Sequence, residues 1–191
     1  LQELSFKSPL FSRDSLDVYV ESVVGASYVM TVDVARGQGI DFSAFSVFDT
    51  TEIPYKVVAK YKNNEVAPLH FPNIINIVGK RYNDAYILVE INDIGSQVAD
   101  VLHHDLEYEY LYSTSWYGRH GQQLSGGVKK DSSFGVRTTR AMKKLGCSNL
   151  KSLLEEDKLL IPDYDMISEL TTFVSSGDSF SADDGAHDDL A

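Results

Sequence analysis

The chain has 191 residues, of which 43% are hydrophobic and 24% are charged, which is enough for one compact domain and too little for two ordinary ones. Its 17 basic and 28 acidic residues give a net charge of -11, so the surface as a whole does not attract nucleic acid, and any such contact needs a local basic patch. The single cysteine excludes an internal disulfide, and no apolar run approaches the ~18 residues that a membrane span needs.

The two ends of the chain suggest a piece of a longer protein. Residues 1–25 are polar in their spacing and predict an irregular lead-in. The chain does not begin with Met and stops at Asp188-Asp189-Leu190-Ala191, which resembles the start of a helix. We therefore expect residues 1–191 to be a single domain excised from a longer chain.

Three segments rich in β-formers come first, at residues 26–33, 42–48 and 55–61. The connections between them are short and carry Gly or Pro, so we expect an antiparallel three-strand meander. Asp33 ends the first segment, and the loop Arg36-Gly37-Gln38-Gly39 follows it. This loop does not open a helix, so it fails to match a dinucleotide-binding fingerprint.

The next segments alternate between helical and extended patterns. Residues 71–82 have helical apolar spacing with Pro72 at the entry, and residues 95–105 also predict an amphipathic helix. Residues 85–91 form a near-continuous apolar run, typical of a strand buried on both faces, and residues 108–113 predict a further strand. This order predicts an α/β fold with a mixed sheet that includes the meander and is flanked by helices.

The last third of the chain is less regular. Residues 115–136 are rich in glycine and serine and predict a surface loop or a protruding hairpin. Helical spacing returns over 137–157, with an expected break near Gly146-Cys147-Ser148 and Ser148 as the N-cap of its second part. A short strand at 158–162, a helix at 165–173 and a turn region at 174–184 complete the prediction.

Three acidic positions stand out by placement. Asp33 ends the first strand, Glu90 interrupts the most apolar strand, and Asp188-Asp189 follow His187 near the end of the chain. A buried carboxylate is costly unless a cation neutralises it, and Mg²⁺ or Mn²⁺ prefers oxygen ligands. The alternative is that these are ordinary solvated carboxylates at a strand end and at a helix N-terminus.

Positive charge is concentrated in one stretch, the basic segment 129–144. It contains six basic residues and a single acidic residue, Asp131. The basic residues are Lys129, Lys130, Arg137, Arg140, Lys143 and Lys144. Arg137, Arg140 and Lys144 recur at helical spacing, so the segment is a candidate phosphate-binding surface. The alternative is a solvated helix face that pairs with Glu155 or Glu156.

Four motifs in this order resemble the C-terminal nuclease domain of the large terminase subunit of T-even-like tailed phages. They are Val32-Asp33 with Arg36–Phe42, then Ile87–Asn92, Gly146–Lys151 and His187–Leu190. Each motif is moderately specific, whereas the ordered set over residues 26–191 is strongly specific. The resemblance implies an RNase H-like fold of the resolvase and integrase type, and a metal-dependent endonuclease that cuts concatemeric viral double-stranded DNA during genome packaging.

The resemblance also implies roles for individual residues. Asp33, Glu90 and Asp189 would be catalytic metal ligands for one or two Mg²⁺ or Mn²⁺ ions, with Asp41 and Asp188 as further acidic ligands. Arg36 stands where relatives carry an acid. An ATPase domain would precede this one, the portal and the small terminase subunit would be partners, and the host cytoplasm would be the location, with no membrane contact.

Two rival functions remain open from the sequence. A junction resolvase of the same fold would cleave four-way junctions far better than linear duplex and would dimerise. A non-catalytic docking module would use its acidic surface to bind a partner protein, with no dependence on metal.

Overall fold

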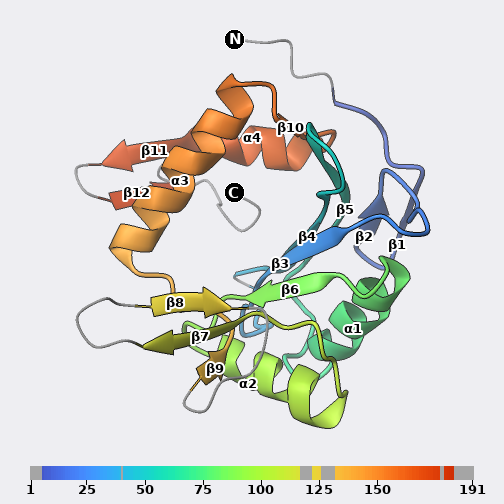
Figure 1. Ribbon diagram of the computed structural model, residues 1–191, viewed down its shortest axis with the longest axis vertical. Coiled ribbons are helices and arrows are strands. Elements are labelled where there is room, and N and C mark those ends of the chain that lie inside the picture. Colours follow the sequence, from blue (N-terminus) through green and yellow to red (C-terminus); the bar gives the residue numbers. More distant parts are fainter. Residues whose placement is uncertain (1–5, 40, 117–121, 126–131, 177–178, 183–191) are drawn as a thin grey trace.

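The computed structural model describes residues 6–39, 41–116, 122–125, 132–176 and 179–182. Its centre is a seven-stranded mixed sheet with strand order β1-β2-β5-β4-β3-β6, in which β10 also pairs with β5 (Figure 1). The strands of this sheet are β1 (Phe11–Arg13), β2 (Leu16–Val18), β3 (Tyr28–Asp33), β4 (Ser43–Asp49), β5 (Tyr55–Asn63), β6 (Tyr86–Val89) and β10 (Leu159–Leu160).

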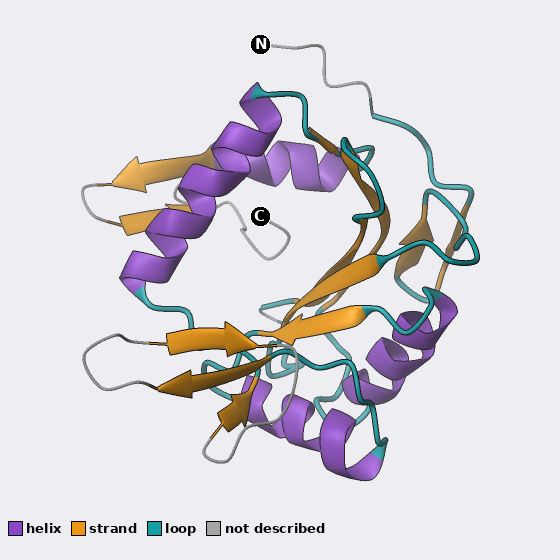
Figure 2. Cartoon of the chain, in the orientation of Figure 1, coloured by secondary structure: helices purple, strands orange, loops and turns teal. Residues whose placement is uncertain are grey.

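Helices cover both faces of this sheet (Figure 2). On one face lie α1 (Phe71–Arg81) and α2 (Gly95–Asp100), which continues into a π-helical turn, η1 (Val101–Asp105). On the other lie α3 (Arg140–Glu155) and α4 (Tyr164–Thr172). In the described part of the chain, no helix is both long and apolar enough to cross a membrane.

Strands β3, β4 and β5 pair antiparallel, which confirms the predicted meander. Strand β6 lies beside β3 and runs parallel to it, with Met30 opposite Ile87 and Val32 opposite Val89. The connection from β5 to β6 passes through α1, where Pro72 occupies the first turn as expected. The fold is therefore the mixed α/β arrangement that the sequence predicts.

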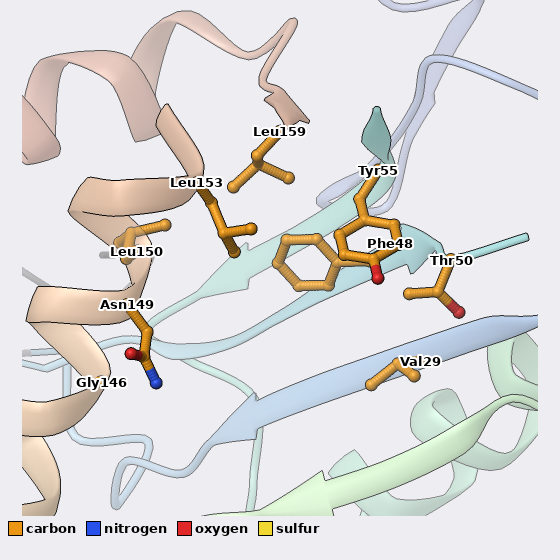
Figure 3. Close-up of a pocket in the computed structure, with 9 residues that line it drawn as sticks. All are labelled: Val29, Phe48, Thr50, Tyr55, Gly146, Asn149, Leu150, Leu153 and Leu159. Carbon is orange, nitrogen blue, oxygen red and sulfur yellow. The ribbon is translucent and has the colours of Figure 1, made fainter. Parts of the chain in front are cut away.

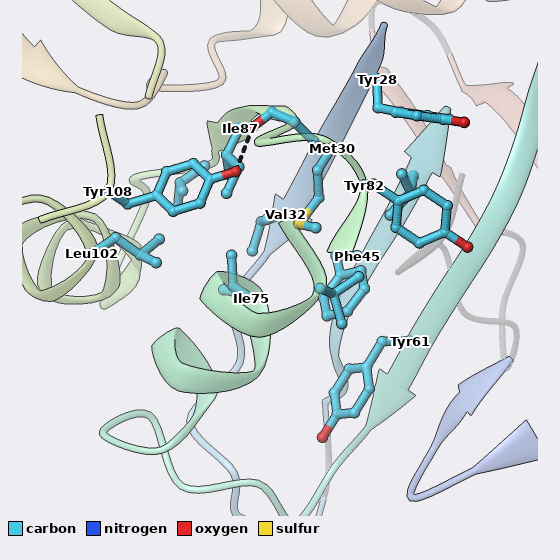
Figure 4. Packing of buried hydrophobic residues seen from close by; sticks show 14 of the residues in the cluster. Tyr28, Met30, Val32, Phe45, Tyr61, Ile75, Tyr82, Ile87, Leu102 and Tyr108 are labelled. Atoms are coloured by element: carbon cyan, nitrogen blue, oxygen red, sulfur yellow. Dashed lines mark hydrogen bonds between the residues drawn. The ribbon is translucent and has the colours of Figure 1, made fainter. Parts of the chain in front are cut away.

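The main core lies between the sheet and helices α1 and α2 (Figure 4). Alternate residues of β3, including Met30 and Val32, point into it, together with Ile87 of β6 and Ile75 of α1. A smaller core, formed by Val57, Leu159, Ile161 and Met166, lies on the opposite face under α3 and α4. The two faces of the sheet therefore belong to two separate apolar clusters.

Two smaller sheets extend from this body. Strand β7 (Ser113–Trp116) pairs antiparallel with β8 (Gln122–Ser125) and with β9 (Ser132–Phe134), in the order β8-β7-β9. Within residues 115–136, the described parts therefore add β8 and β9. Strand β11 (Phe173–Ser176) pairs with β12 (Ser179–Ala182), so the turn region expected over 174–184 is wrong. Backbone pairing needs no apolar side chains, and this polar segment gave no strand signal.

The N-terminal lead-in also differs from its prediction. Within residues 1–25, β1 and β2 form a hairpin, and β2 pairs antiparallel with β5. The two turn residues, Asp14 and Ser15, both have positive φ, which is the backbone of a two-residue hairpin turn that glycine usually marks in a sequence.

Two further boundaries are corrections. Helix α3 runs unbroken through Gly146, and Thr139 caps it instead of Ser148, because the Thr139 side chain accepts a hydrogen bond from the Met142 backbone N–H. In the predicted strand 108–113, Leu111 makes an isolated bridge to Ile87, and the strand itself begins at Ser113. Tyr108 instead buries its ring, and its hydroxyl donates to the Ala85 carbonyl at 2.7 Å.

Candidate metal centre

Asp33 and Glu90 lie side by side at the carboxyl ends of two parallel strands. The register places Val32 opposite Val89, and the Glu90 backbone N–H donates to the Val32 carbonyl at 2.9 Å. Asp33 and Glu90 each follow these paired residues, so they occupy neighbouring positions on strands that lie ~4.8 Å apart. Ligand sites in open α/β sheets form at this end of adjacent parallel strands.

The two carboxylates also share a face of the sheet. Val32 and Val89 are buried in the main core, and successive side chains of a strand point to opposite faces. Asp33 and Glu90 therefore point away from that core, and both are partly buried. Two half-buried negative charges at neighbouring positions repel each other, and a divalent cation between them would relieve that repulsion.

A side-chain amide holds the Glu90 carboxylate. The Asn92 Nδ2 donates to Glu90 Oε1 at 2.7 Å and to the Thr138 carbonyl at 3.3 Å. Glu90 also forms an isolated parallel bridge with Val136. The strand end that carries Glu90 is thus bonded to the segment that leads into α3.

Two glycines allow this close approach of backbones. A methyl group on Gly95 would overlap the Glu90 carbonyl oxygen. Gly135 has φ +87°, and a side chain there would overlap the Val89 carbonyl oxygen and Ile91. Both glycines are therefore required by the packing around the end of β6.

An ion pair links the loops that follow the two carboxylates. Arg36 Nε and Nη2 donate to Asp93 Oδ2 and Oδ1, both at 2.7 Å. These hydrogen bonds lower the pKa of Asp93 below its usual value and raise the pKa of Arg36. The resemblance places Arg36 where relatives carry an acidic residue. In this chain Arg36 forms a bidentate ion pair with Asp93 beside the candidate site.

Of the remaining predicted ligands, only Asp41 lies within the described residues, and it does not join this pair. Asp41 is exposed in the loop before β4, and the described residues contain no group of three or more His, Cys, Asp and Glu side chains able to hold a metal ion. Asp188, Asp189 and His187 lie outside the described residues. The structure thus brings together two of the predicted carboxylates, Asp33 and Glu90.

The basic segment passes next to Glu90 at Val136. Arg137 directly follows Val136, the bridge partner of Glu90, and is exposed. Because α3 begins at Arg140, Arg137 precedes the helix, and the predicted three-residue helical stripe is wrong. Arg140 and Lys144, both exposed, do share a helix face, with the partly buried Lys143 beside them, whereas Lys129 and Lys130 lie outside the described residues.

Sequence reasoning missed Asn92 and Asp93 as members of this site. Both lie in the loop that follows β6, and such a loop is where a sheet of this type places its functional side chains. Their position directly after a predicted buried strand was therefore a usable signal.

A pocket of about 310 Å³ lies elsewhere, between α3 and the sheet (Figure 3). Its lining is almost entirely apolar and comes from β3, β4, β5, β10 and α3. The lining residues are Val29, Phe48, Thr50, Tyr55, Gly146, Asn149, Leu150, Leu153 and Leu159. None of the described residues that line this pocket carries a carboxylate, so the carboxylate pair Asp33 and Glu90 lies outside it.

Comparisons with known proteins agree with this architecture. The family model for the terminase RNaseH-like domain matches residues 30–191. The large terminase nuclease of thermophilic phage G20c with bound magnesium is 17% identical, with a TM-score of 0.72 over 98% of this chain and 88% of that chain. The same nuclease with bound cobalt is 18% identical, with a TM-score of 0.71 over 98% of this chain and 88% of that chain. The large terminase nuclease domain of Thermus phage P74-26 is 17% identical, with a TM-score of 0.68 over 98% of this chain and 86% of that chain.

Proposed function

Because this chain belongs to the terminase RNaseH-like domain family, we propose that it is a divalent-metal-dependent endonuclease that cuts concatemeric viral double-stranded DNA during genome packaging. The observation that carries the proposal is the pair of carboxylates, Asp33 and Glu90, on one face at the adjacent ends of β3 and β6. Structures of the phage G20c large terminase nuclease contain bound magnesium, cobalt or zinc, which supports a divalent cation here.

The donor set fits a hard cation. Carboxylate oxygens are the ligands that Mg²⁺ and Mn²⁺ prefer, and we assign Asp33 and Glu90 as the first two. Asp189 is the proposed third, with Asp188 and Asp41 as further candidates. When bound, such ions activate a water molecule and stabilise the leaving oxygen of a phosphodiester.

The basic residues of segment 129–144 would hold the DNA backbone. The exposed Arg137 and Arg140 lie close along the chain to Val136, which bridges to Glu90. Contacts of this kind position a duplex without reading its sequence, so we expect weak sequence preference. Within a packaging complex the domain would act beside an ATPase domain, the portal and the small terminase subunit in the host cytoplasm, as part of a large terminase of the T-even-like type.

Nicking of supercoiled plasmid in Mg²⁺ or Mn²⁺ tests this function. Asp33→Asn and Glu90→Gln should each abolish cutting, because each removes a negative charge from the proposed metal site. Glu52→Gln is the matched control, since Glu52 is exposed in the connection between β4 and β5. Cutting by both site variants at the rate of the parent would reject the nuclease.

The same preparation separates the rival functions. Calorimetric titration with Mn²⁺ should give heat in the parent and much less in Glu90→Gln, whereas a docking module would give no heat that depends on Glu90. Strong preference for a four-way junction over linear duplex would indicate a resolvase instead.

A further inference from the structure

Asn92 stands at the point where the candidate metal ligand meets the backbone of the basic segment. Its side-chain amide has two N–H donors, and both are engaged, one by Glu90 Oε1 at 2.7 Å and one by the Thr138 carbonyl at 3.3 Å. The orientation of the amide is therefore fixed from two sides. A carboxylate that accepts such a hydrogen bond loses freedom to rotate about its side chain.

The loop that carries Asn92 is itself held in place. Next to it, Asp93 has φ +52° and forms the bidentate pair with Arg36. On the other side, the Ile91 N–H donates to the Val136 carbonyl at 2.8 Å. Although Asn92 is exposed, its backbone is thus fixed by both neighbours, so its amide can hold a partner in one position.

We propose that Asn92 is a positioning residue that fixes the Glu90 carboxylate for a divalent cation. The bond to Oε1 leaves the second oxygen, Oε2, for the cation, and the bond to Thr138 anchors the amide to the segment between Arg137 and α3. This proposal rests on the proposed function, because it assumes that Glu90 binds a metal ion. Groups that hydrogen-bond to metal ligands in this way typically change metal affinity 10- to 100-fold when removed.

The test follows Mn²⁺ binding without any DNA. The melting temperature of the parent should rise with Mn²⁺ concentration, because a ligand that binds the folded state stabilises it. Asn92→Ala should need about 10- to 100-fold more Mn²⁺ for the same rise, while its melting temperature without metal stays close to that of the parent. Plasmid nicking should show the same shift in the Mn²⁺ requirement, with the maximal rate largely recovered at saturating Mn²⁺.

Asn73→Ala is the matched control, because Asn73 is exposed on α1, and it should leave the Mn²⁺ requirement unchanged. If Asn92→Ala responds to Mn²⁺ as the parent does, the positioning role is rejected while the nuclease proposal stands. If it lowers the metal-free melting temperature and leaves the Mn²⁺ requirement unchanged, Asn92 is only structural and the proposal is likewise rejected. A parent that shows no response to Mn²⁺ would reject the metal site itself.

Discussion

Lys60 is a charged side chain buried in the middle of β5, with a side-chain exposure of 5%. Its Nζ lies 2.7 Å from Asp163, 2.6 Å from Asp165 and 3.6 Å from Asp17. Burial disfavours its charge, but the hydrogen bonds to Asp163 and Asp165 outweigh burial and raise the pKa of Lys60. Burial has the opposite effect on a carboxyl group, and it raises the pKa of Asp17. The Lys60 cluster (Asp17, Lys60, Asp163 and Asp165) thus joins β2, β5 and the start of α4.

Replacement of Lys60 tests how much this cluster contributes to the stability of the fold. Lys60→Met should lower the free energy of unfolding by about 3–5 kcal/mol, because it leaves the buried carboxylate of Asp163 without its cation. Lys56→Met, at an exposed position of the same strand, should change it little. Urea unfolding of both variants checks this, and equal stabilities would show that the cluster contributes little to the fold.

At the scale of single residues, sequence reasoning found charges by their placement but not by their partners. Asp33 was identifiable because it ends a predicted strand, and Glu90 because it interrupts the most apolar one. Lys60 was not, because a lysine in a strand has the pattern of a solvent-facing residue, and its two nearest partners, Asp163 and Asp165, are far from it in the sequence. Asn92 was missed for the same reason, since its bond to Thr138 depends on the fold.

At the scale of elements, regular hydrophobic patterns predicted strands and helices correctly, whereas single interruptions of a pattern led to wrong boundaries. Strands β3, β4 and β5 and helix α1 follow clear β or helical patterns. In α3 the break expected near Gly146-Cys147-Ser148 is absent, because glycine costs only about 1 kcal/mol within a helix. The hairpin β11–β12 depends on backbone pairing between polar residues, which composition does not reveal.

Two glycines give opposite expectations in the same experiment. Nothing lies within 4 Å of a methyl group placed on Gly146, so Gly146→Ala should stabilise the protein by about 0.5–1 kcal/mol. Gly95→Ala should destabilise it by about 3 kcal/mol, because the new methyl group would overlap the Glu90 carbonyl. Denaturant unfolding measures both, and a destabilised Gly146→Ala would mean that α3 does not tolerate a methyl group there.

At the scale of the whole molecule, the charge distribution limits how DNA can approach. The chain carries a net charge of -11, so a DNA duplex would be attracted only where basic side chains gather, as they do in the sequence of the basic segment 129–144. Affinity for DNA should therefore depend strongly on salt and on few residues.

This dependence gives a direct measurement. Arg140→Ala should reduce the slope of the logarithm of DNA affinity against the logarithm of salt concentration by about 0.9, the value for one lost phosphate contact. Lys151→Ala is the control on the same helix, since Lys151 lies 3.7 Å from Glu155 and is already paired. Binding is measured in EDTA to prevent cutting, and an unchanged slope in Arg140→Ala would exclude that residue from the DNA contact.

The two apolar clusters have a consequence for local stability. The main core closes between the sheet and α1 and α2, whereas α3 has no buried residue of its own. Strand β10 joins this part to the sheet through a short parallel pairing with β5. We therefore expect α3 to open locally at a lower free energy than the main core, while α4 stays tied to β5 through the Lys60 cluster.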